Sequence, residues 1–178
     1  MLIAGDNVAP ELLAEVSVLA HAARVVGVYR RDDLPHGQRP VTLALWRVGD
    51  PGNVGTLLRS ADAFGAAVAL SAGCADPTGP KALRASMGAL FRVPTLGFEE
   101  AAGRRVALVP HGGEPLPEVD LSGEVVFALG AEREGLPADV LERCDVCASI
   151  PQAGDAESLN VAMAGTVALY ERSRQRPG

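Results

Sequence analysis

The chain has 178 residues, a formal net charge of −6 and an isoelectric point near 5.1. This length suits one sizeable core and is too short for two ordinary domains, and the acidity argues against a protein that coats nucleic acid through its net charge. No uncharged apolar run reaches the roughly 18 residues of a membrane span. The sequence shows no basic segment followed by an apolar one, so it does not indicate a secretory signal. We therefore expect a cytoplasmic protein that does not bind membranes.

Residues 1–39 differ from the rest of the chain. Residues 10–22 predict a short helix, residues 24–29 a strand, and residues 31–40, with two prolines and a glycine, a linker. One helix and one strand cannot bury a core alone, so this segment must pack on something else. Residues 40–178 form the second expected part of the chain.

The basic residues are almost all arginines, and Lys81 is the only lysine. The arginines gather early in the chain and at its end, at Arg24, Arg30, Arg31, Arg39, Arg172, Arg174 and Arg176. Guanidinium groups suit phosphate oxygens, although solvated charge on an arginine-rich surface explains any single one of them equally well.

The cysteines predict neither a disulfide framework nor a metal centre. There are three of them, and Cys144 and Cys147 form a CxxC pair without the further ligands that zinc needs. The histidines are scattered, at His21, His36 and His111. We expect buried free thiols in a reducing cytoplasm, and no metal.

From residue 41 onward, strand-like runs alternate with helix-like runs. The strands are predicted at residues 41–46, 67–71, 92–96, 105–109, 125–129 and 146–149, and the helices at residues 53–64, 80–88, 98–102, 137–143 and 158–173. This alternation predicts an α/β fold with a parallel sheet covered by helices on both faces. The last helix is apolar almost all round, so it must be buried on more than one side, in the core or in a subunit interface.

Residues 53–65 form the most informative stretch. They follow the strand-like run at 41–46 and a break rich in glycine and proline at 48–52, so the expected order is strand, loop and helix. We expect Asn53 at the N-cap of this helix and Arg59 in its second turn. Loops at the carboxyl ends of strands bind ligands in open α/β sheets; an ordinary capped helix with a solvated arginine is the alternative.

A second glycine-rich loop follows the apolar run at residues 125–129. Gly130 and Gly135 flank Glu132 there. Gly130 would let the backbone come close to a flat ligand, and Glu132 is expected at the mouth of the sheet.

The third segment, residues 149–161, runs into the apolar last helix. Ser158 and Asn160 are residue types that cap helix N-termini, so capping alone explains each of them. Each of the three segments is a weak signal by itself. Their order, with every one placed after a strand, predicts one functional site.

Together the three segments resemble motifs 1, 2 and 3 of the SpoU (TrmH-type) branch of the SPOUT RNA methyltransferases, over roughly residues 41–173. The matching positions are Asn53, Gly55, Arg59, Ala61, Phe64, Gly65, Gly130, Glu132, Gly135, Leu136, Ile150, Pro151, Ser158, Leu159, Asn160, Val161, Tyr170 and Glu171. Two positions depart from the family pattern: Gln152 stands where methionine is common, and Ala131 where asparagine or serine is common. Both lie in the expected cofactor loops.

The resemblance implies an S-adenosyl-L-methionine-dependent enzyme that methylates a ribose 2′-hydroxyl of rRNA or tRNA. It also implies a SPOUT-type sheet with a C-terminal trefoil knot, and a homodimer built across the knot that completes the active site with residues from both subunits. Residues 1–39 would then be the remnant of an N-terminal substrate-recognition domain, or the head of a minimal form.

Five polar residues are the catalytic candidates implied by the resemblance: Asn53, Arg59, Glu132, Ser158 and Asn160. A ribose hydroxyl must be aligned with the methyl donor and must lose its proton, yet the three motifs contain no histidine, cysteine or lysine. Because a guanidinium stays protonated at neutral pH, we expect Arg59 to hold RNA phosphate and to stabilise the developing alkoxide. Glu132 would orient Arg59 or Asn53, and the amides of Asn53 and Asn160 would donate hydrogen bonds. Ser158 would contact the substrate or cap the last helix.

The expected cofactor contacts are Gly130, which allows close approach, and Ile150 and Leu159, which would wall the adenine. No G-x-G-x-x-G follows the first strand and no Walker A sequence is present, which argues against a Rossmann-type methyltransferase and against NAD. Two alternatives stay open: a SPOUT enzyme that methylates a base nitrogen, and an inactive cofactor-binding module that binds RNA.

Overall fold

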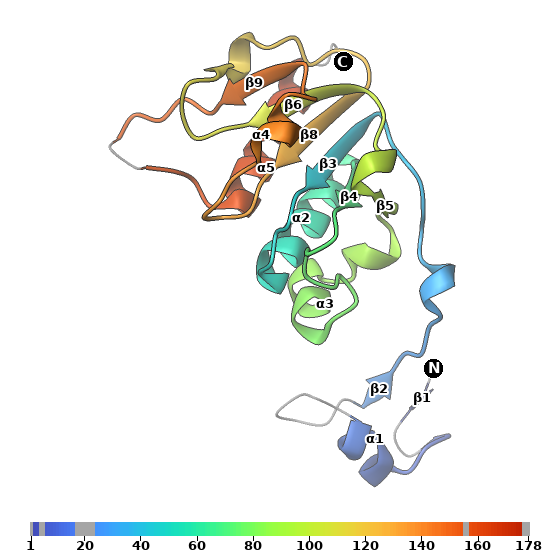
Figure 1. The fold of residues 1–178 in the computed structure, drawn as a ribbon. Helices are drawn as coiled ribbons and strands as arrows, with labels where there is room; N and C mark the ends of the chain where they lie inside the picture. Colours follow the sequence, from blue (N-terminus) through green and yellow to red (C-terminus); the bar gives the residue numbers. More distant parts are fainter. Residues whose placement is uncertain (1, 4–5, 17–23, 155–156, 176–178) are drawn as a thin grey trace. The chain divides into compact units, whose positions relative to one another are not determined.

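The computed structural model describes residues 2–3, 6–16, 24–154 and 157–175. It divides the chain into two compact units, Met1–Leu34 and Pro35–Gly178 (Figure 1). The boundary falls inside the segment predicted as a linker. Within the described residues, no helix has both the length and the apolar character needed to cross a bilayer.

The first unit is small. It contains β1 (Leu2–Ile3), α1 (Pro10–Val16), β2 (Val25–Val26) and the 3₁₀ turn η1 (Arg31–Asp33), and its two strands pair antiparallel. The strand predicted at residues 24–29 is therefore only two residues long. Of the helix predicted at 10–22, the part at residues 17–22 lies outside the described residues.

The second unit is built on a seven-stranded sheet in the order β5-β4-β3-β8-β6-β9-β7. Its strands are β3 (Val41–Leu45), β4 (Ala67–Leu70), β5 (Thr95–Gly97), β6 (Arg104–Leu108), β7 (Glu114–Pro115), β8 (Val125–Leu129) and β9 (Val146–Ser149). Every neighbouring pair is parallel, and all residues of β3 and β8 are buried. The predicted parallel sheet is confirmed, with β7 as a strand that the sequence pattern missed.

In the described residues of this unit, four α-helices and three 3₁₀ turns accompany the sheet. They are α2 (Pro51–Phe64), α3 (Pro80–Ser86), η2 (Ala89–Phe91), η3 (Phe98–Glu100), η4 (Leu116–Glu118), α4 (Ala138–Leu141) and α5 (Val161–Gln175). The helix predicted at 98–102 is only the turn η3. The last helix begins three residues later than predicted.

One face of the sheet is covered by α2 and α5, which pack closely at Gly165. A β-carbon at this glycine would lie 2.5 Å from Leu57 Cδ2 of α2 and 3.3 Å from Leu129 Cδ2 of β8. The hydroxyl groups of Ser60 and Thr166 join the same two helices at 2.7 Å. The missing side chain at Gly165 therefore lets α5 reach both the sheet and α2.

The opposite face is covered by η3 and α4. Phe98 of η3 and Val140 of α4 pack in one buried cluster with Ala44 and Val126 of the central strands. Trp46 meets the Phe98 ring edge-on, with the centroids 5.0 Å apart. Helical elements thus cover both faces of the sheet, as predicted.

The helix α5 is not buried all round in the single chain. Its buried side carries Val161, Ala162, Gly165, Ala168, Leu169, Glu171 and Arg172. Met163, Val167 and Tyr170 are 62%, 38% and 58% exposed, and their spacing of four and three residues places them in one stripe. The prediction that this helix is covered on more than one side is therefore not met within one chain.

Residues 109–113 cross the strand β9. They connect β6, which pairs with β9 on one side, to β7, which pairs with β9 on the other. Gly113 is pressed against the crossed strand, since a β-carbon there would lie 2.7 Å from the Ala148 carbonyl carbon. We call residues 109–113 the strap.

Candidate functional site

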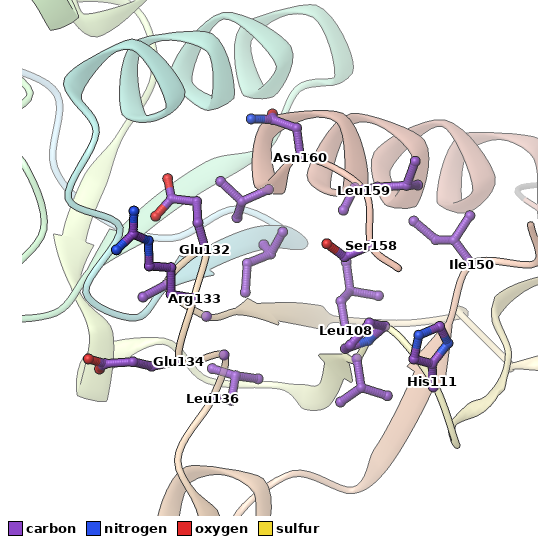
Figure 2. A pocket seen from close by; sticks show the side chains of 18 of the residues that line it. Leu108, His111, Glu132, Arg133, Glu134, Leu136, Ile150, Ser158, Leu159 and Asn160 are labelled. Carbon is purple, nitrogen blue, oxygen red and sulfur yellow. The ribbon is translucent and has the colours of Figure 1, made fainter. Parts of the chain in front are cut away.

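A pocket of about 910 Å³ opens at the carboxyl ends of the neighbouring strands β8, β6 and β9 (Figure 2). Three loops line it: residues 108–111 after β6, residues 129–136 after β8, and residues 150–161 after β9, of which 155 and 156 lie outside the described residues. This is the edge at which open parallel sheets bind ligands. In Figure 2 the side chains of Glu132 and Arg133 lie toward one end of the pocket, and those of Ile150 and His111 toward the other.

Six of the eight predicted site residues line this pocket. They are Gly130, Glu132, Ile150, Ser158, Leu159 and Asn160. Asn53 does not line it but is hydrogen-bonded to two residues that do. Arg59 does not line it, and it makes no hydrogen bond or ion pair with the described residues that do. The two departures from the family pattern, Ala131 and Gln152, are both lining residues.

Asn53, Glu132 and Asn160 form one hydrogen-bonded chain. Asn160 Oδ1 accepts the backbone N–H groups of Ala162 at 2.9 Å and Met163 at 3.3 Å, so its Nδ2 faces away from α5. That Nδ2 donates to Asn53 Oδ1 at 3.1 Å, and Asn53 Nδ2 donates to Glu132 Oε1 at 2.6 Å. The orientation of both amides is therefore fixed. At one end Asn160 Oδ1 caps the helix, and at the other end the Glu132 carboxylate can only accept a hydrogen bond.

The N-cap of α2 is Asp50, so the prediction that Asn53 caps this helix is wrong. Asp50 has extended backbone angles, and its Oδ1 accepts the backbone N–H of Asn53 at 3.0 Å. Pro51 occupies the first helical position, where a missing N–H costs nothing. The side chain of Asn53 is therefore free of capping and reaches Glu132 and Asn160.

Asn160, by contrast, does cap α5, and Ser158 takes no part in the cap. Its hydroxyl makes no hydrogen bond with a side chain or backbone group that the structure describes, and the residue is exposed in the pocket wall. Of its two predicted roles, helix capping is absent from the described residues, and substrate contact stays a prediction.

Gly130 is required by the loop itself. A β-carbon there would lie 2.1 Å from the carbonyl carbon of Gly135 and 2.4 Å from the nitrogen of Leu136. The loop is closed by the Gly135 N–H, which donates to the Ala131 carbonyl at 2.9 Å. The close approach predicted at Gly130 is therefore first of all an approach to the chain's own backbone, which shapes the pocket wall.

Arg59 lies in the third turn of α2 rather than the second, because the helix begins at Pro51. It is exposed and makes no hydrogen bond or ion pair with another residue in the described part of the chain. Glu132, which was predicted to orient Arg59 or Asn53, bonds to Asn53. The Arg59 guanidinium is thus held by none of the described residues that line the pocket.

The loop after β6, which was not among the predicted site segments, brings His111 into the pocket lining together with Leu108. The signal was present, because the predicted strand at 105–109 ends at the same edge as the other two. Arg133, Glu134 and Glu157 also line the pocket. They stand inside the predicted loops and had not been singled out.

The cysteines are separate from this site. All three are free thiols, as predicted, and each is partly buried. Burial raises the pKa of the Cys144 thiol, which favours its protonated form. Within the described residues, no three side chains of His, Cys, Asp or Glu are grouped as metal ligands.

The fold and the pocket define a parallel α/β protein with a ligand site at the carboxyl ends of three strands, and comparison with known proteins gives its family. The model of the SpoU rRNA methylase family matches residues 40–170. The chain belongs to this family.

Characterised relatives are similar along most of the chain. It is 37% identical over 190 residues to the 23S rRNA (uridine(2479)-2′-O)-methyltransferase of Streptomyces viridochromogenes, covering 94% of this chain and 66% of that protein. It is also 37% identical over 133 residues to the 23S rRNA (guanosine(2553)-2′-O)-methyltransferase RlmP of Bacillus subtilis, covering 69% and 54%. The chain spans about half to two thirds of the length of such relatives.

Solved structures of methyltransferases have a fold similar to that of this chain. An AdoMet-bound rRNA methyltransferase from Sinorhizobium meliloti superposes with a TM-score of 0.72 at 36% identity, over 82% of this chain and 60% of that one. The SpoU methyltransferase AviRb from Streptomyces viridochromogenes, in complex with AdoMet, gives 0.70 at 33% identity, over 82% and 64%.

Proposed function

We propose that this chain transfers a methyl group from S-adenosyl-L-methionine to a ribose 2′-hydroxyl of rRNA or tRNA. The observation that carries the proposal is the chain of hydrogen bonds from Glu132 through Asn53 to Asn160, which joins three family motifs at one pocket. The names of two relatives support the reaction, since both methylate a 2′-hydroxyl of 23S rRNA at different nucleotides.

The pocket suits S-adenosyl-L-methionine. Its volume of about 910 Å³ lies in the range of small-molecule sites. Ile150 and Leu159 supply apolar surface on which a nucleobase can pack, and the loop that begins at Gly130 presents backbone groups. Three lining carboxylates, Glu132, Glu134 and Glu157, favour a cationic ligand. When bound, the cofactor supplies an electrophilic methyl group, and relatives are solved with it.

The polar residues then position the hydroxyl. Glu132 holds the Asn53 amide in one orientation, and the α5 cap holds that of Asn160, so both amides are preorganised before RNA arrives. Preorganised donors and acceptors align a weak nucleophile without reorganisation at the moment of reaction. Ser158 lies in the same wall and would contact the ribose.

Arg59 would act on the RNA. Its guanidinium is exposed and is not held by any described residue of its own chain, which leaves its planar fork available for a phosphate. It would stabilise the alkoxide as the proton leaves through phosphate or water. Arg59 does not line the pocket of its own chain, and we propose that RNA together with a second subunit completes the site.

A homodimer is the assembly that we propose. The exposed stripe Met163, Val167 and Tyr170 lies on α5, whose first turn is at the pocket. Covering this stripe with a second copy would bury apolar surface and bring two sites together. The chain would also be knotted at its C-terminal end; the crossing of β9 by the strap, and the position of β8 between β3 and β6, support this.

Residues 1–39 are proposed to belong to a substrate-recognition region. The unit Met1–Leu34 is compact by itself, and Leu12, Val16 and Val28 are 55%, 64% and 76% exposed. A small unit with this much exposed apolar surface suits contact with further protein.

The experiment that tests the function uses unmodified transcripts of 23S rRNA and of tRNA, incubated with the protein and methyl-labelled S-adenosyl-L-methionine. Digestion to nucleosides and mass spectrometry should give a 2′-O-methylnucleoside from one class of RNA. A base-methylated nucleoside would replace the proposal with base N-methylation. Cofactor binding without any product from either RNA, or from total RNA of a strain that lacks the gene, would indicate an inactive binding module.

A further inference from the structure

Asp50 lies outside the pocket but holds the residue at the centre of the site's hydrogen bonds. Its Oδ1 accepts the backbone N–H of Asn53 at 3.0 Å, and its Oδ2 accepts from Lys81 Nζ at 2.7 Å. One carboxylate therefore joins the first turn of α2 to the only lysine of the chain, at the start of α3. The side chains of Asp50 and Lys81 are 44% and 61% exposed, respectively, so the ion pair itself contributes little to stability. The position that the Asp50 carboxylate gives to the Asn53 backbone matters more.

Gly52 leaves room for this arrangement. A β-carbon at this position would lie 2.7 Å from Asp50 Oδ1 and 3.6 Å from Lys81 Cε. The carboxylate folds over the first turn in space that any side chain at residue 52 would take. The lysine hydrogen bond, followed by the Asn53 N–H, lowers the pKa of Asp50, so both bonds are charge-assisted at neutral pH.

The cap acts on the same residue whose side chain builds the site. Asp50 fixes the backbone of Asn53, and the Asn53 carboxamide bonds to Glu132 at 2.6 Å and to Asn160 at 3.1 Å. Neither bond tolerates a large shift of the Asn53 backbone, since hydrogen bonds weaken steeply away from their preferred geometry. A displacement of about 1 Å in a catalytic constellation can lower turnover ~100-fold.

We propose that Asp50 is a positioning residue: it places the Asn53 carboxamide between Glu132 and Asn160, and Lys81 orients the Asp50 carboxylate by binding the oxygen that faces away from α2. The geometric part of this proposal concerns the chain without ligand or RNA. Only its consequence for turnover rests on the proposed function.

The geometric part is tested by NMR of side-chain amides. The chain has three asparagines and three glutamines, so six NH₂ pairs are expected, and Asn53→Ala and Asn160→Ala identify two of them by loss. Asp50→Ala should shift the NH₂ signals of both Asn53 and Asn160. Asp50→Ser keeps a capping oxygen and should shift them less. Lys81→Met should move them, whereas Lys81→Arg should not.

Gly52→Ala provides a second route to the same displacement without removing the carboxylate. It should shift the same two NH₂ pairs, and Gly27→Ala, where the added carbon meets no described atom within 4 Å, is the control. If Asp50→Ala and Gly52→Ala leave both pairs at their wild-type positions in folded protein, the proposal is overturned.

Turnover separates positioning from simple helix stabilisation. Asp50→Ala should lower kcat ~5- to 20-fold with an unchanged KM for S-adenosyl-L-methionine, and Asp50→Ser should restore part of it. In an Asn53→Ala background, Asp50→Ala should lower kcat less than about twofold further. Equal losses in both backgrounds would mean that Asp50 acts independently of Asn53 and would overturn the proposal. A wild-type chain that methylates no RNA would instead refute the proposed function and leave the amide result to decide.

Discussion

Asn160 Nδ2 donates to Asn53 Oδ1 at 3.1 Å, and this bond joins the N-cap of α5 to the first turn of α2 across 107 positions of sequence. Both amides are oriented by what lies beyond them, a helix cap on one side and the Glu132 carboxylate on the other. Substitutions here should therefore have effects that depend on the donor or acceptor character of the new side chain, and not only on its size.

Asn53→Asp should be destabilising in a pH-dependent way. It replaces the donor facing Glu132 by a second carboxylate at hydrogen-bonding distance, so one member of the pair binds a proton more tightly in the folded state. A folded-state pKa above the unfolded one means that the penalty, about 1 kcal/mol, is present at neutral pH and disappears as the pH falls below ~4. Urea unfolding at several pH values checks this. Asn53→Ala, which removes the same bond without adding charge, should lack the pH dependence.

Arg59→Ala should lower turnover by several orders of magnitude and leave cofactor binding intact, because Arg59 does not line the pocket. Calorimetry with S-adenosylhomocysteine and single-turnover methylation measure the two effects. Arg59→Lys should not restore activity, since a point charge cannot form the planar fork to phosphate. Wild-type turnover in the lysine variant would show that charge alone is needed.

Gly130→Ala should abolish cofactor binding and lower stability. The added carbon would lie 2.1 Å from the Gly135 backbone, so the loop of residues 130–136 must open. The cost should be roughly 1–3 kcal/mol, typical of overpacking. Gly27→Ala, which lies outside the pocket and whose added carbon meets no described atom within 4 Å, is the control, and it should bind S-adenosylhomocysteine like the wild type. A Gly130→Ala variant with normal affinity would mean that the pocket does not depend on this loop shape.

Glu171 should contribute to stability only above acidic pH. The pKa of Glu171 is lowered chiefly by the hydrogen bond from Arg174, and Glu171 is buried on α5. Because the folded-state pKa is depressed, the contribution is present above the ordinary glutamate pKa of ~4.3 and is lost as the pH falls through the lower folded value. Glu171→Gln should therefore cost about 1 kcal/mol at pH 7 and little at pH 3. Thermal unfolding of both proteins across this range measures the difference.

Val167→Glu should produce a monomer. The residue lies in the middle of the exposed stripe on α5, and a charge there would be buried without a partner in the proposed dimer. Light scattering should report a dimer for the wild type and a monomer for the variant at micromolar concentration. A wild-type monomer would remove the dimer proposal together with the shared active site.

Much of the fold was predictable, because the buried strands β3 and β8 are long apolar runs between turn residues. The strand β7 was not, since Glu114 and Pro115 carry no strand pattern and pair with β9 only through the strap. The helix predicted at 98–102 ends early because Ala101 already has an extended backbone. Tertiary contacts, not local preference, decide such short elements.

The site was predictable as a set of loops, but not as a set of contacts. Asp50 and Asn53 are both cap-type residues, and Pro51 at the first helical position was the signal that favoured Asp50. Pairing Glu132 with Asn53 depends on where three loops meet in space, which no spacing in the sequence encodes. The entry of His111 into the lining follows from strand order, which brings β6 next to β8.

The two outer strands of the sheet restrict how this unit can associate. At one border, β5 is already paired: the Thr95 N–H donates to Pro35, and the Gly37 N–H donates to Thr95. At the other, β7 has two residues, and Pro115 has no N–H to offer. In the described part of the chain, neither border presents a long template for strand addition, the usual route to aggregation and domain swapping. We therefore expect the proposed dimer to form through helix surfaces, such as the α5 stripe, and not by strand addition.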